Sequence, residues 1–291
     1  MHLWQHLSLQ ISQYNRQAFH INAHTSLSGG CINSAYKVSD GHSNYFVKLN
    51  SIEHCAMFET EWQALQELHE RAAVRVPRPV CHGQHESQAY LVLEYLPLCG
   101  RPDATLLGQQ LAATHRVSAA QFGWHTNNVI GATPQQNQQK PDWVDFWRSQ
   151  RLIPQLQLAE QNGYAGALSP VTDKLLSSFD ALFENYTPIP SLLHGDLWGG
   201  NAAALADGTP VMFDPALYYG DRETDIAMTH LFGGFDRQFY TAYNEAWPLN
   251  DGFAIRKKLY NLYHILNHLN LFGTGYQQQA ISLCQQVLAE I

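Results

Sequence analysis

The stretch that most constrains this chain is LLHGDLWGGN (residues 192–201), which is followed by VMFDP (residues 211–215). It contains Asp196 and, five residues later, Asn201, while Asp214 ends the short apolar run. A positioned carboxylate can accept the proton of a hydroxyl and so make it a nucleophile for phosphoryl transfer. Mg²⁺, which neutralises phosphate charge, prefers hard oxygen ligands such as Asp and Asn side chains. The pattern therefore predicts Asp196 as a catalytic base and Asn201 and Asp214 as Mg²⁺ ligands.

A purely structural explanation of the same residues is a glycine-rich hairpin. Asp196 and Asn201 would then be turn residues, and Asp214 would start a turn before Pro215. An isolated Asp and Asn at this spacing favours that explanation. The full order of His, Gly, Asp, Leu, Asn, apolar strand and Asp is much rarer by chance, and the first half of the chain supplies parts that match it. We therefore favour the catalytic interpretation.

Length, charge and cysteine content exclude several classes of protein. The chain has 291 residues, enough for one large domain or for two lobes with separate cores. A formal net charge of −8 without a Lys/Arg cluster argues against nucleic-acid binding and suits an amine-bearing small substrate. No run approaches the roughly 18 apolar residues of a membrane helix, and five scattered cysteines without a C-x-x-C pair indicate no zinc site or disulfide framework. We expect a cytoplasmic protein that binds neither membrane nor nucleic acid.

The N-terminal third has the pattern of a small sheet with helices. Helical spacing predicts helices over residues 3–14 and 53–71, and alternation predicts strands over 19–27, 35–39, 45–49, 80–82 and 89–94, the last two around a turn at Gly83. A glycine turn with Gly29 and Gly30 follows the first strand, and Lys48 lies on the third. Glycines let backbone amides approach phosphate oxygens, and a lysine adds positive charge. A plain turn and a solvated lysine are the alternative, because the full G-x-G-x-x-G pattern is missing.

Two further features of this region bear on nucleotide binding. Glu61, thirteen residues after Lys48, is a candidate to hold the lysine toward phosphate. Glu59, Glu67 and Glu70 compete for that role, and a solvated helix face explains most of the four. Where the fifth strand ends, backbone groups of Leu93, Glu94 and Tyr95 could hydrogen-bond an adenine edge. We place the boundary there, with an N-lobe over residues 1–96 that binds nucleotide and a C-lobe over residues 97–291 that carries the catalytic loop and the acceptor site.

The C-terminal part is mainly helical, with helices predicted over residues 104–116, 143–159, 170–186, 255–269 and 282–289. The polar and aromatic segment 122–137 is too long for a simple connector, so we expect it, with Asn128, to form part of an acceptor pocket. Trp198 and the segment 218–225, with Asp221 and Glu223, are further candidates for that pocket. Carboxylates favoured at the positive end of a helix dipole explain the acidic segment equally well.

With these parts in order, the chain resembles the protein-kinase-like superfamily and, more narrowly, the fructosamine (ketosamine-3-) kinase family, which is related to aminoglycoside and choline kinases. The resemblance covers nearly the whole chain and is carried by GGCINSAY, FVKLN, FETEW, LVLEYL, FGWHTNNVIGATPQQN, LLHGDLWGGN and VMFDPALYYGDRETDIAM. It implies a two-lobed α+β fold, with a five-stranded antiparallel N-lobe containing one helix and a mainly helical C-lobe.

The resemblance also implies roles for individual residues. Asp196 would be the base, and Asn201 and Asp214 would bind Mg²⁺. Lys48, paired with Glu61, would contact the phosphates of ATP, with the adenine at the end of the fifth strand. The implied reaction is ATP-dependent phosphorylation of the 3-hydroxyl of a ketosamine, that is, a fructosamine, ribulosamine or erythrulosamine. Its unstable product releases the free amine, which amounts to deglycation of a protein or small amine.

Departures from the protein-kinase pattern concern regulation. Gly195 replaces the arginine that usually follows the loop histidine, and Pro215 follows Asp214 in place of Phe-Gly. The chain between Asp214 and the next helix is too short for a phosphorylatable activation loop. We therefore expect a site that is assembled without phosphorylation.

The sequence leaves several points open. Other functions compatible with it are a kinase of another amino- or hydroxyl-bearing metabolite, such as an aminoglycoside, choline or homoserine, and a nucleotide-binding module without catalysis. The module is disfavoured because the base, both metal ligands and the lysine are all present. Cys31, among turn amides that favour an anion, is a candidate redox-active thiol, with a small packing residue as the alternative. Both a monomer and a homodimer are compatible with the sequence.

Overall fold

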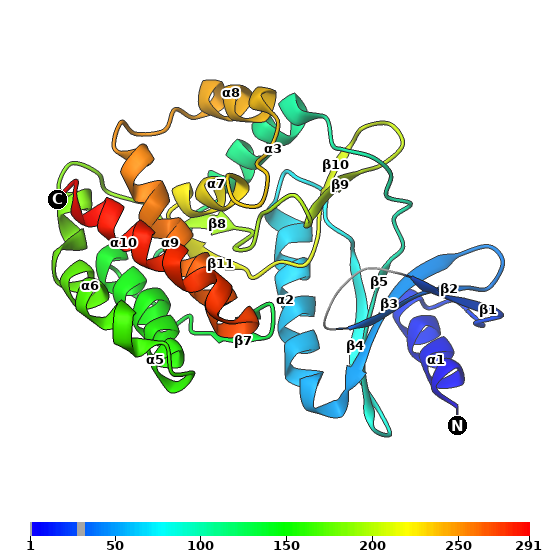
Figure 1. Ribbon diagram of the computed structural model, residues 1–291. Helices are drawn as coiled ribbons and strands as arrows, with labels where there is room; N and C mark the ends of the chain where they lie inside the picture. Colours follow the sequence, from blue (N-terminus) through cyan, green and yellow to red (C-terminus); the bar gives the residue numbers. More distant parts are fainter. Residues whose placement is uncertain (1, 28–32) are drawn as a thin grey trace.

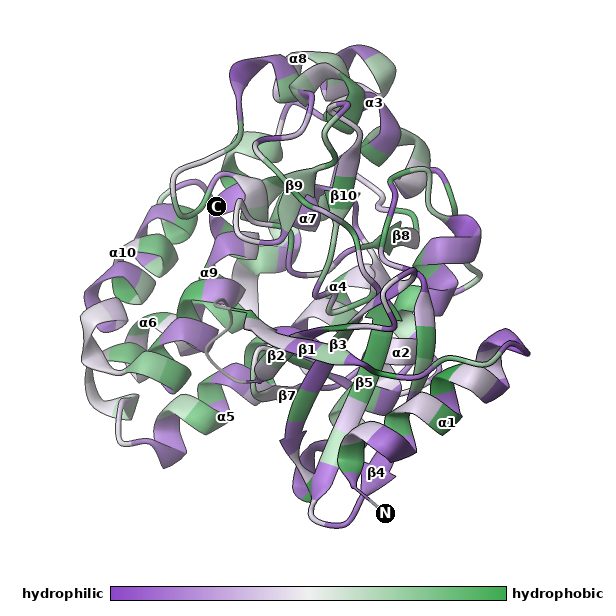
Figure 2. Ribbon diagram, turned by 90° about the vertical axis from the view of Figure 1, so that its right-hand side faces the viewer, coloured by the Kyte–Doolittle hydropathy of each residue, from purple (hydrophilic) through white to green (hydrophobic). Residues whose placement is uncertain are grey.

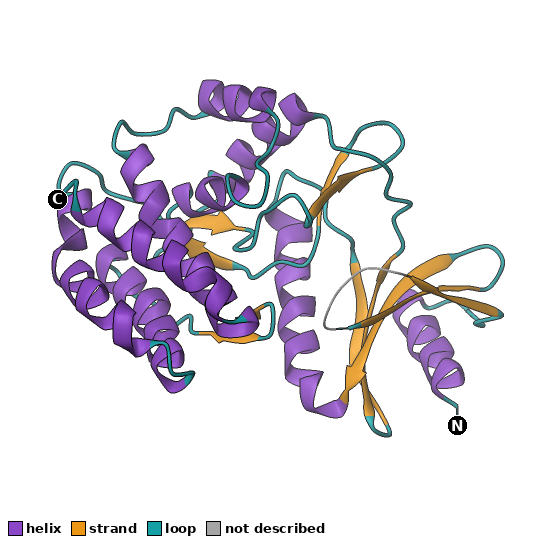
Figure 3. Cartoon of the chain, in the orientation of Figure 1, coloured by secondary structure: helices purple, strands orange, loops and turns teal. Residues whose placement is uncertain are grey.

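The computed structural model describes residues 2–27 and 33–291 (Figure 1). The glycine turn that contains Gly29, Gly30 and Cys31 lies outside the described residues, so the predicted phosphate contact and the predicted redox role remain predictions. The described chain forms a strand-rich N-terminal part and a helix-rich C-terminal part (Figure 3).

The N-lobe is built on a five-stranded antiparallel sheet, as expected. Its strands occur in the order β1-β2-β3-β5-β4 and comprise β1 (Ala23–Leu27), β2 (Ser34–Ser39), β3 (Asn44–Ser51), β4 (Pro79–His85) and β5 (Gln88–Glu94). The predicted turn at Gly83 is wrong, because Gly83 pairs with Tyr90 inside the sheet. The chain instead reverses at Glu86, whose φ of 54° falls in the left-handed region used by tight turns.

Two helices cover opposite faces of this sheet (Figure 1). Successive strand residues point to opposite faces, so Val47 and Val92 join the helix α1 (Leu3–Asn15) in one small core. Leu91 and Leu93 face the other way and pack with the helix α2 (Cys55–Arg71). The hydrophobic cluster that they form continues into the C-lobe. The sequence pattern had predicted both helices, whereas the family resemblance alone implied one. A 3₁₀ turn (Ile52–His54) leads into α2.

The C-lobe is organised around α9 (Phe253–Phe272), a largely buried helix that packs against α5, α7 and α10. The other helical segments are α3 (Ala104–His115), α4 (Trp143–Phe146), a π-helical turn (Trp147–Leu152), α5 (Ile153–Gln161), α6 (Ala165–Ser178), a 3₁₀ turn (Phe179–Phe183), α7 (Glu223–Thr229), α8 (Arg237–Ala246), a 3₁₀ turn (Thr274–Tyr276) and α10 (Gln277–Leu288). Apolar residues concentrate where these helices meet one another and the sheet (Figure 2). Within residues 2–27 and 33–291, no helix has both the length and the apolar character needed to cross a membrane.

Three short two-stranded sheets lie in the C-lobe, and the loops that contain the predicted site residues begin or end at their strands. They pair β8 (Ser191–Leu193) with β11 (Tyr218–Gly220), β9 (Ala202–Ala204) with β10 (Pro210–Met212), and β6 (Asn128–Ile130) with β7 (Thr133–Gln135). The loop from β8 to β9 contains Asp196 and Asn201, and the loop from β10 to β11 contains Asp214. Because β8 pairs with β11, the two loops leave the same small sheet side by side.

Candidate active site

A cavity of about 750 Å³ lies between the lobes and collects most of the predicted site residues. The N-lobe contributes Lys48 and Glu61 to its wall, and the C-lobe contributes Asp196, Asn201 and Asp214. These five side chains come from sequence positions as far apart as β3 and the loop after β10. Candidate residues from both lobes therefore line one cavity.

Lys48 lies in the wall of this cavity because of the alternation along β3. Its neighbours Val47 and Leu49 point into the N-lobe core, so Lys48 points into the cleft. Its Nζ lies 2.6 Å from Oε1 of Glu61 and 2.7 Å from Oδ1 of Asp214. Burial alone would lower the pKa of Lys48, but the two carboxylates outweigh it and raise the pKa above its usual range. The lysine is thus held charged and extended across the cleft.

Asp214 has an unusual backbone conformation. Its φ of 57° is in the left-handed region, which costs a non-glycine residue about 1–3 kcal/mol and is frequent at functional sites. The preceding residue is fixed by a 3.1 Å hydrogen bond from Phe213 N to Asn201 O. The Asp214 side chain remains 50% exposed in the cleft, although it is paired with Lys48. The strained backbone of Asp214 therefore directly follows a residue that is hydrogen-bonded to the loop of Asn201.

Asp196 and Asn201 face each other across their loop. Asn201 Nδ2 donates to Asp196 O at 2.9 Å and to Asp196 Oδ2 at 3.3 Å. Burial, and after it the nearby charge of Asp214, raise the pKa of Asp196 to about 7, although the hydrogen bond from Asn201 opposes this. Because the Asn201 amide nitrogen is used by Asp196, its carbonyl oxygen is the group left for a ligand in the cavity.

The donor set suits Mg²⁺. Asn201 offers a carbonyl oxygen and Asp214 a carboxylate, both in the wall of the same cavity, and such sites use one or two carboxylates together with substrate phosphates. In the described part of the chain, no group of three or more His, Cys, Asp or Glu side chains is placed to hold a metal ion. A cation here would accordingly need oxygens from a bound nucleotide as well.

Gly195 lets the two site loops touch. Its φ is 83°, and a Cβ atom added to it would lie 2.0 Å from Ala216 O. In return, Ala216 N donates to His194 O at 2.9 Å. A side chain at position 195 would force the loops apart, which gives a physical reason for glycine where protein kinases have arginine.

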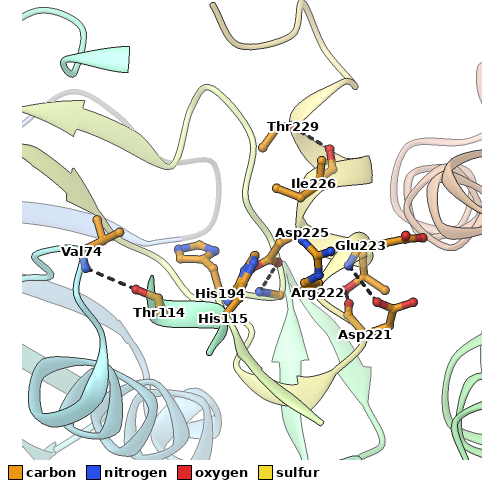
Figure 4. A network of polar contacts seen from close by, with 12 residues as sticks. Val74, Thr114, His115, His194, Asp221, Arg222, Glu223, Asp225, Ile226 and Thr229 are labelled. Atoms are coloured by element: carbon orange, nitrogen blue, oxygen red, sulfur yellow. Dashed lines mark hydrogen bonds and ion pairs between the residues drawn. The ribbon is translucent and has the colours of Figure 1, made fainter. Parts of the chain in front are cut away.

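Asp225, in the first turn of α7, holds the same loop by accepting hydrogen bonds from its backbone (Figure 4). Its carboxylate accepts from His194 N at 2.8 Å, from Gly195 N at 2.9 Å and from His115 Nε2 at 3.2 Å. Burial would raise the pKa of Asp225, but these hydrogen bonds, led by that of His115, lower it overall. From the sequence, Asp225 is placed only within the acceptor segment 218–225 or at the start of a helix, because its partners lie about 30 and 110 residues away.

The prediction that Asp221 and Glu223 contact the acceptor is wrong. Both are buried, with exposed fractions of 1% and 0%, and neither is in the cavity wall. Asp221 accepts from the hydroxyls of Tyr260 at 2.5 Å and Tyr186 at 2.8 Å. Glu223 binds Arg256 through both oxygens, at 2.7 and 2.9 Å. A buried carboxylate requires such partners, so these two serve the interior of the C-lobe.

Of the other acceptor candidates, Asn128 and Trp198 both line the cavity. The Asn128 amide is engaged, since it donates to Leu217 O at 2.9 Å and accepts from Gln135 and Asn137. It therefore shapes the wall. Trp198 is 37% exposed, and its ring meets Phe232, itself 43% exposed, edge-on at 6.0 Å.

The opposite end of the cavity is apolar and includes the predicted adenine segment. Leu93, Glu94 and Tyr95 are in its wall, but the Glu94 carboxylate is occupied by Arg75 at 2.6 Å and by Arg78 N at 3.2 Å. Glu94 would therefore contact an adenine base through its backbone groups. The sequence did not single out the other apolar residues of the cavity wall, which are Leu27, Ala35, Phe46, Met57, Pro77, Leu96, Leu98 and Phe213.

A five-stranded lobe whose lysine faces an Asp–Asn loop and a second aspartate across a cleft defines a protein-kinase-like phosphotransferase. Within that class, the chain belongs to the fructosamine kinase family, whose sequence model matches residues 3–290. It is 48% identical over 288 residues to a "probable ketoamine kinase" of Synechocystis sp., covering 98% of this chain and 97% of that protein. It is 39% identical over 267 residues to a chloroplastic protein-ribulosamine 3-kinase of Arabidopsis thaliana, covering 90% and 82% of the two chains.

Solved structures agree with this placement. The crystal structure of a Haemophilus somnus protein provisionally named fructosamine-3-kinase superposes with a TM-score of 0.89 at 26% identity, over 99% of this chain and 100% of that one. An aminoglycoside phosphotransferase bound to ADP and hygromycin B superposes with a TM-score of 0.64 at 16% identity, over 99% and 98% of the two chains, which shows a shared fold.

Proposed function

We propose that this protein transfers the γ-phosphoryl group of ATP to the 3-hydroxyl of a ketosamine. The observation that carries the proposal is the contact of Lys48 with both Glu61 and Asp214 in the cavity that also contains Asp196 and Asn201. The family of the chain and the name of its Arabidopsis relative, a protein-ribulosamine 3-kinase, support the choice of acceptor.

The two ends of the cavity suit the two parts of ATP. The apolar end near Leu93 and Tyr95 suits a planar base, and Lys48 lies where a triphosphate would extend toward the C-lobe. Mg²⁺ bound through Asn201 and Asp214 would neutralise phosphate charge during transfer. Glu61 keeps the lysine extended, so that its ammonium group is already positioned when a nucleotide arrives.

The role proposed for Asp196 concerns the acceptor. Its carboxylate would accept a hydrogen bond from the 3-hydroxyl and orient it toward the γ-phosphorus. It would take the proton as the new O–P bond forms and the bond from the γ-phosphorus to the bridging oxygen breaks, which releases ADP. The exposed ring of Trp198 borders the same space and could pack against the apolar face of the sugar. Family resemblance adds that the 3-phosphate product is unstable and frees the amine, which would make the reaction a deglycation.

The experiment that tests this function is ADP formation with a synthetic ribulosamine, measured beside choline, homoserine and an aminoglycoside. We expect ADP to form with the ribulosamine at least a hundredfold more efficiently, in kcat/KM, than with the other three. Identification of the phosphate at C3 of the sugar by ³¹P and ¹³C NMR completes the test. Equal or greater activity with one of the other acceptors would assign the protein to a different small-molecule kinase.

A further inference from the structure

The helix α2 carries Glu61, so the position of α2 decides whether Glu61 reaches Lys48. Phe58, Leu65 and Leu68 anchor this helix in the main core. Apolar contact is non-directional, and it leaves rotation and sliding of a helix weakly defined. Six residues beyond Glu61, about 9 Å along the helix axis, lies a polar contact of a different kind, at Glu67.

Glu67 links α2 to two separate segments of the C-lobe. Its Oε2 accepts from Trp124 Nε1 at 2.7 Å, and its Oε1 accepts from the Tyr219 hydroxyl at 2.6 Å. Arg71, one turn further along α2, lies 3.2 Å from the same Oε1 and also contacts the Tyr219 hydroxyl. Trp124 and Tyr219 are each only 4% exposed. Hydrogen bonds to an ionised carboxylate are short, strong and directional, so this contact defines where α2 sits.

The two donors belong to one stiff piece of the C-lobe. Gly123 N donates to Tyr219 O at 2.8 Å, and Tyr219 N donates to Gly123 O at 2.9 Å. Tyr219 lies in β11, whose partner β8 leads directly into the loop of Asp196, and Asp214 is five residues before it. Glu67 therefore ties the helix that holds Glu61 to the strand pair from which both site loops emerge.

We propose that Glu67 is a positioning residue, which holds α2 against Trp124 and Tyr219 and thereby keeps the Lys48–Glu61 pair assembled in the absence of any modification. The inference rests on the proposed kinase function and explains how the site is held ready without an activation loop. Loss of the hydrogen bonds from Trp124 and Tyr219 to Glu67 would let α2 shift, and Glu61 would no longer hold Lys48 toward the nucleotide phosphates.

The test is the affinity for AMP-PNP with Mg²⁺, measured by calorimetry, in Glu67→Ala, Glu67→Gln and the wild type. We expect Glu67→Ala to bind about tenfold more weakly with an unchanged stoichiometry of one. Glu67→Gln should stay within about threefold of the wild type, because its amide oxygen can accept from Trp124 and its amide nitrogen can donate to the Tyr219 hydroxyl. Glu70→Ala is the matched control, since Glu70 is exposed on the same helix and bonds only Gln66 among the described residues.

A double-mutant cycle separates positioning from mere support of the fold. If Glu67 acts through Glu61, then Glu67→Ala should cost less than about twofold in affinity once Glu61→Gln is present. The inference is overturned if Glu67→Ala binds like Glu70→Ala, if Glu67→Gln fails as badly as Glu67→Ala, or if the two losses simply multiply. A wild type that binds AMP-PNP but forms no ADP with any ketosamine would contradict the proposed acceptor and leave this test intact.

Discussion

The ammonium group of Lys48 lies 2.7 Å from a carboxylate oxygen of Asp214, although 166 residues separate them in the sequence. The contact spans the cleft between the sheet of the N-lobe and the loop after β10. Glu61 completes the arrangement from a third element, α2. Three segments remote in sequence therefore meet at one point, and that point faces the loop of Asp196.

Replacement of Lys48 tests the nucleotide side of this arrangement. Lys48→Met should lower kcat/KM for ATP by at least a hundredfold, because the phosphates lose a preorganised positive charge and because Glu61 and Asp214 are left facing each other. Steady-state kinetics with varied ATP measure the effect. Lys174→Met, at an exposed position on α6, serves as the control and should retain wild-type kinetics. Retention of more than a tenth of the wild-type kcat/KM by Lys48→Met would contradict the role.

Substitution of Gly195 tests the close approach of the two site loops. In Gly195→Ala the new Cβ would lie 2.0 Å from Ala216 O, at a φ of 83° that L-residues rarely adopt. We expect a loss of at least about 2 kcal/mol in the free energy of unfolding and a corresponding loss of activity. Gly199→Ala in the same loop meets nothing within 4 Å and should change stability by less than about 0.5 kcal/mol. Similar stabilities for the two variants in urea unfolding would show that the approach is not required.

Acid stability should depend on His264, in the buried face of α9. Burial, followed by the nearby His268, lowers the pKa of His264 to about 3, against about 6.5 in an unfolded chain. Between these values the unfolded state binds more protons than the folded state, so stability rises with pH from about 3 to 6.5 and is constant above. This residue therefore lowers the free energy of unfolding at pH 5 by about 2 kcal/mol relative to pH 8.

The measurement is urea unfolding of the wild type and His264→Leu at pH 5 and pH 8. The free energy of unfolding of the wild type should differ between pH 8 and pH 5. His264→Leu should reduce that difference by about 2 kcal/mol, whatever it does to stability at pH 8. His42→Leu, at an exposed hairpin position, controls for the general effect of losing a histidine. A pH difference that is the same in His264→Leu as in the wild type would assign the acid sensitivity elsewhere.

The sequence identifies the candidate residues whose roles are indicated by their spacing along the chain. Asp196, Asn201 and Asp214 lie within one short segment, and Lys48 lies on a strand whose alternation can be counted, so the sequence indicates all four as candidates, and all four line the cavity. Glu61 was separable from its competitors only in three dimensions. The rotation of α2 against β3 leaves Glu59 and Glu70 exposed and brings Glu61 to the lysine.

The residues that sequence reasoning missed or misplaced depend on distant partners. From the sequence, Glu67 is interpreted only as a competitor of Glu61 for Lys48 or as part of a solvated helix face, because its partner Tyr219 is 152 residues away. Asp221 and Glu223 were placed in the acceptor pocket because an acidic run is polar in sequence whether it is exposed or buried. Their actual partners, Tyr260 and Arg256, lie on α9, and nothing local to residues 218–225 indicates them.

The most direct test of the account is Asp196→Asn, assayed for phosphorylation of a ribulosamine and, separately, for AMP-PNP binding. The substitution keeps the shape of the side chain and removes its capacity to accept the proton of the 3-hydroxyl. We predict that turnover falls by about a thousandfold or more while the affinity for the nucleotide stays within about threefold of the wild type. A fall in turnover of less than about tenfold, equivalent to about 1.4 kcal/mol, would contradict the account.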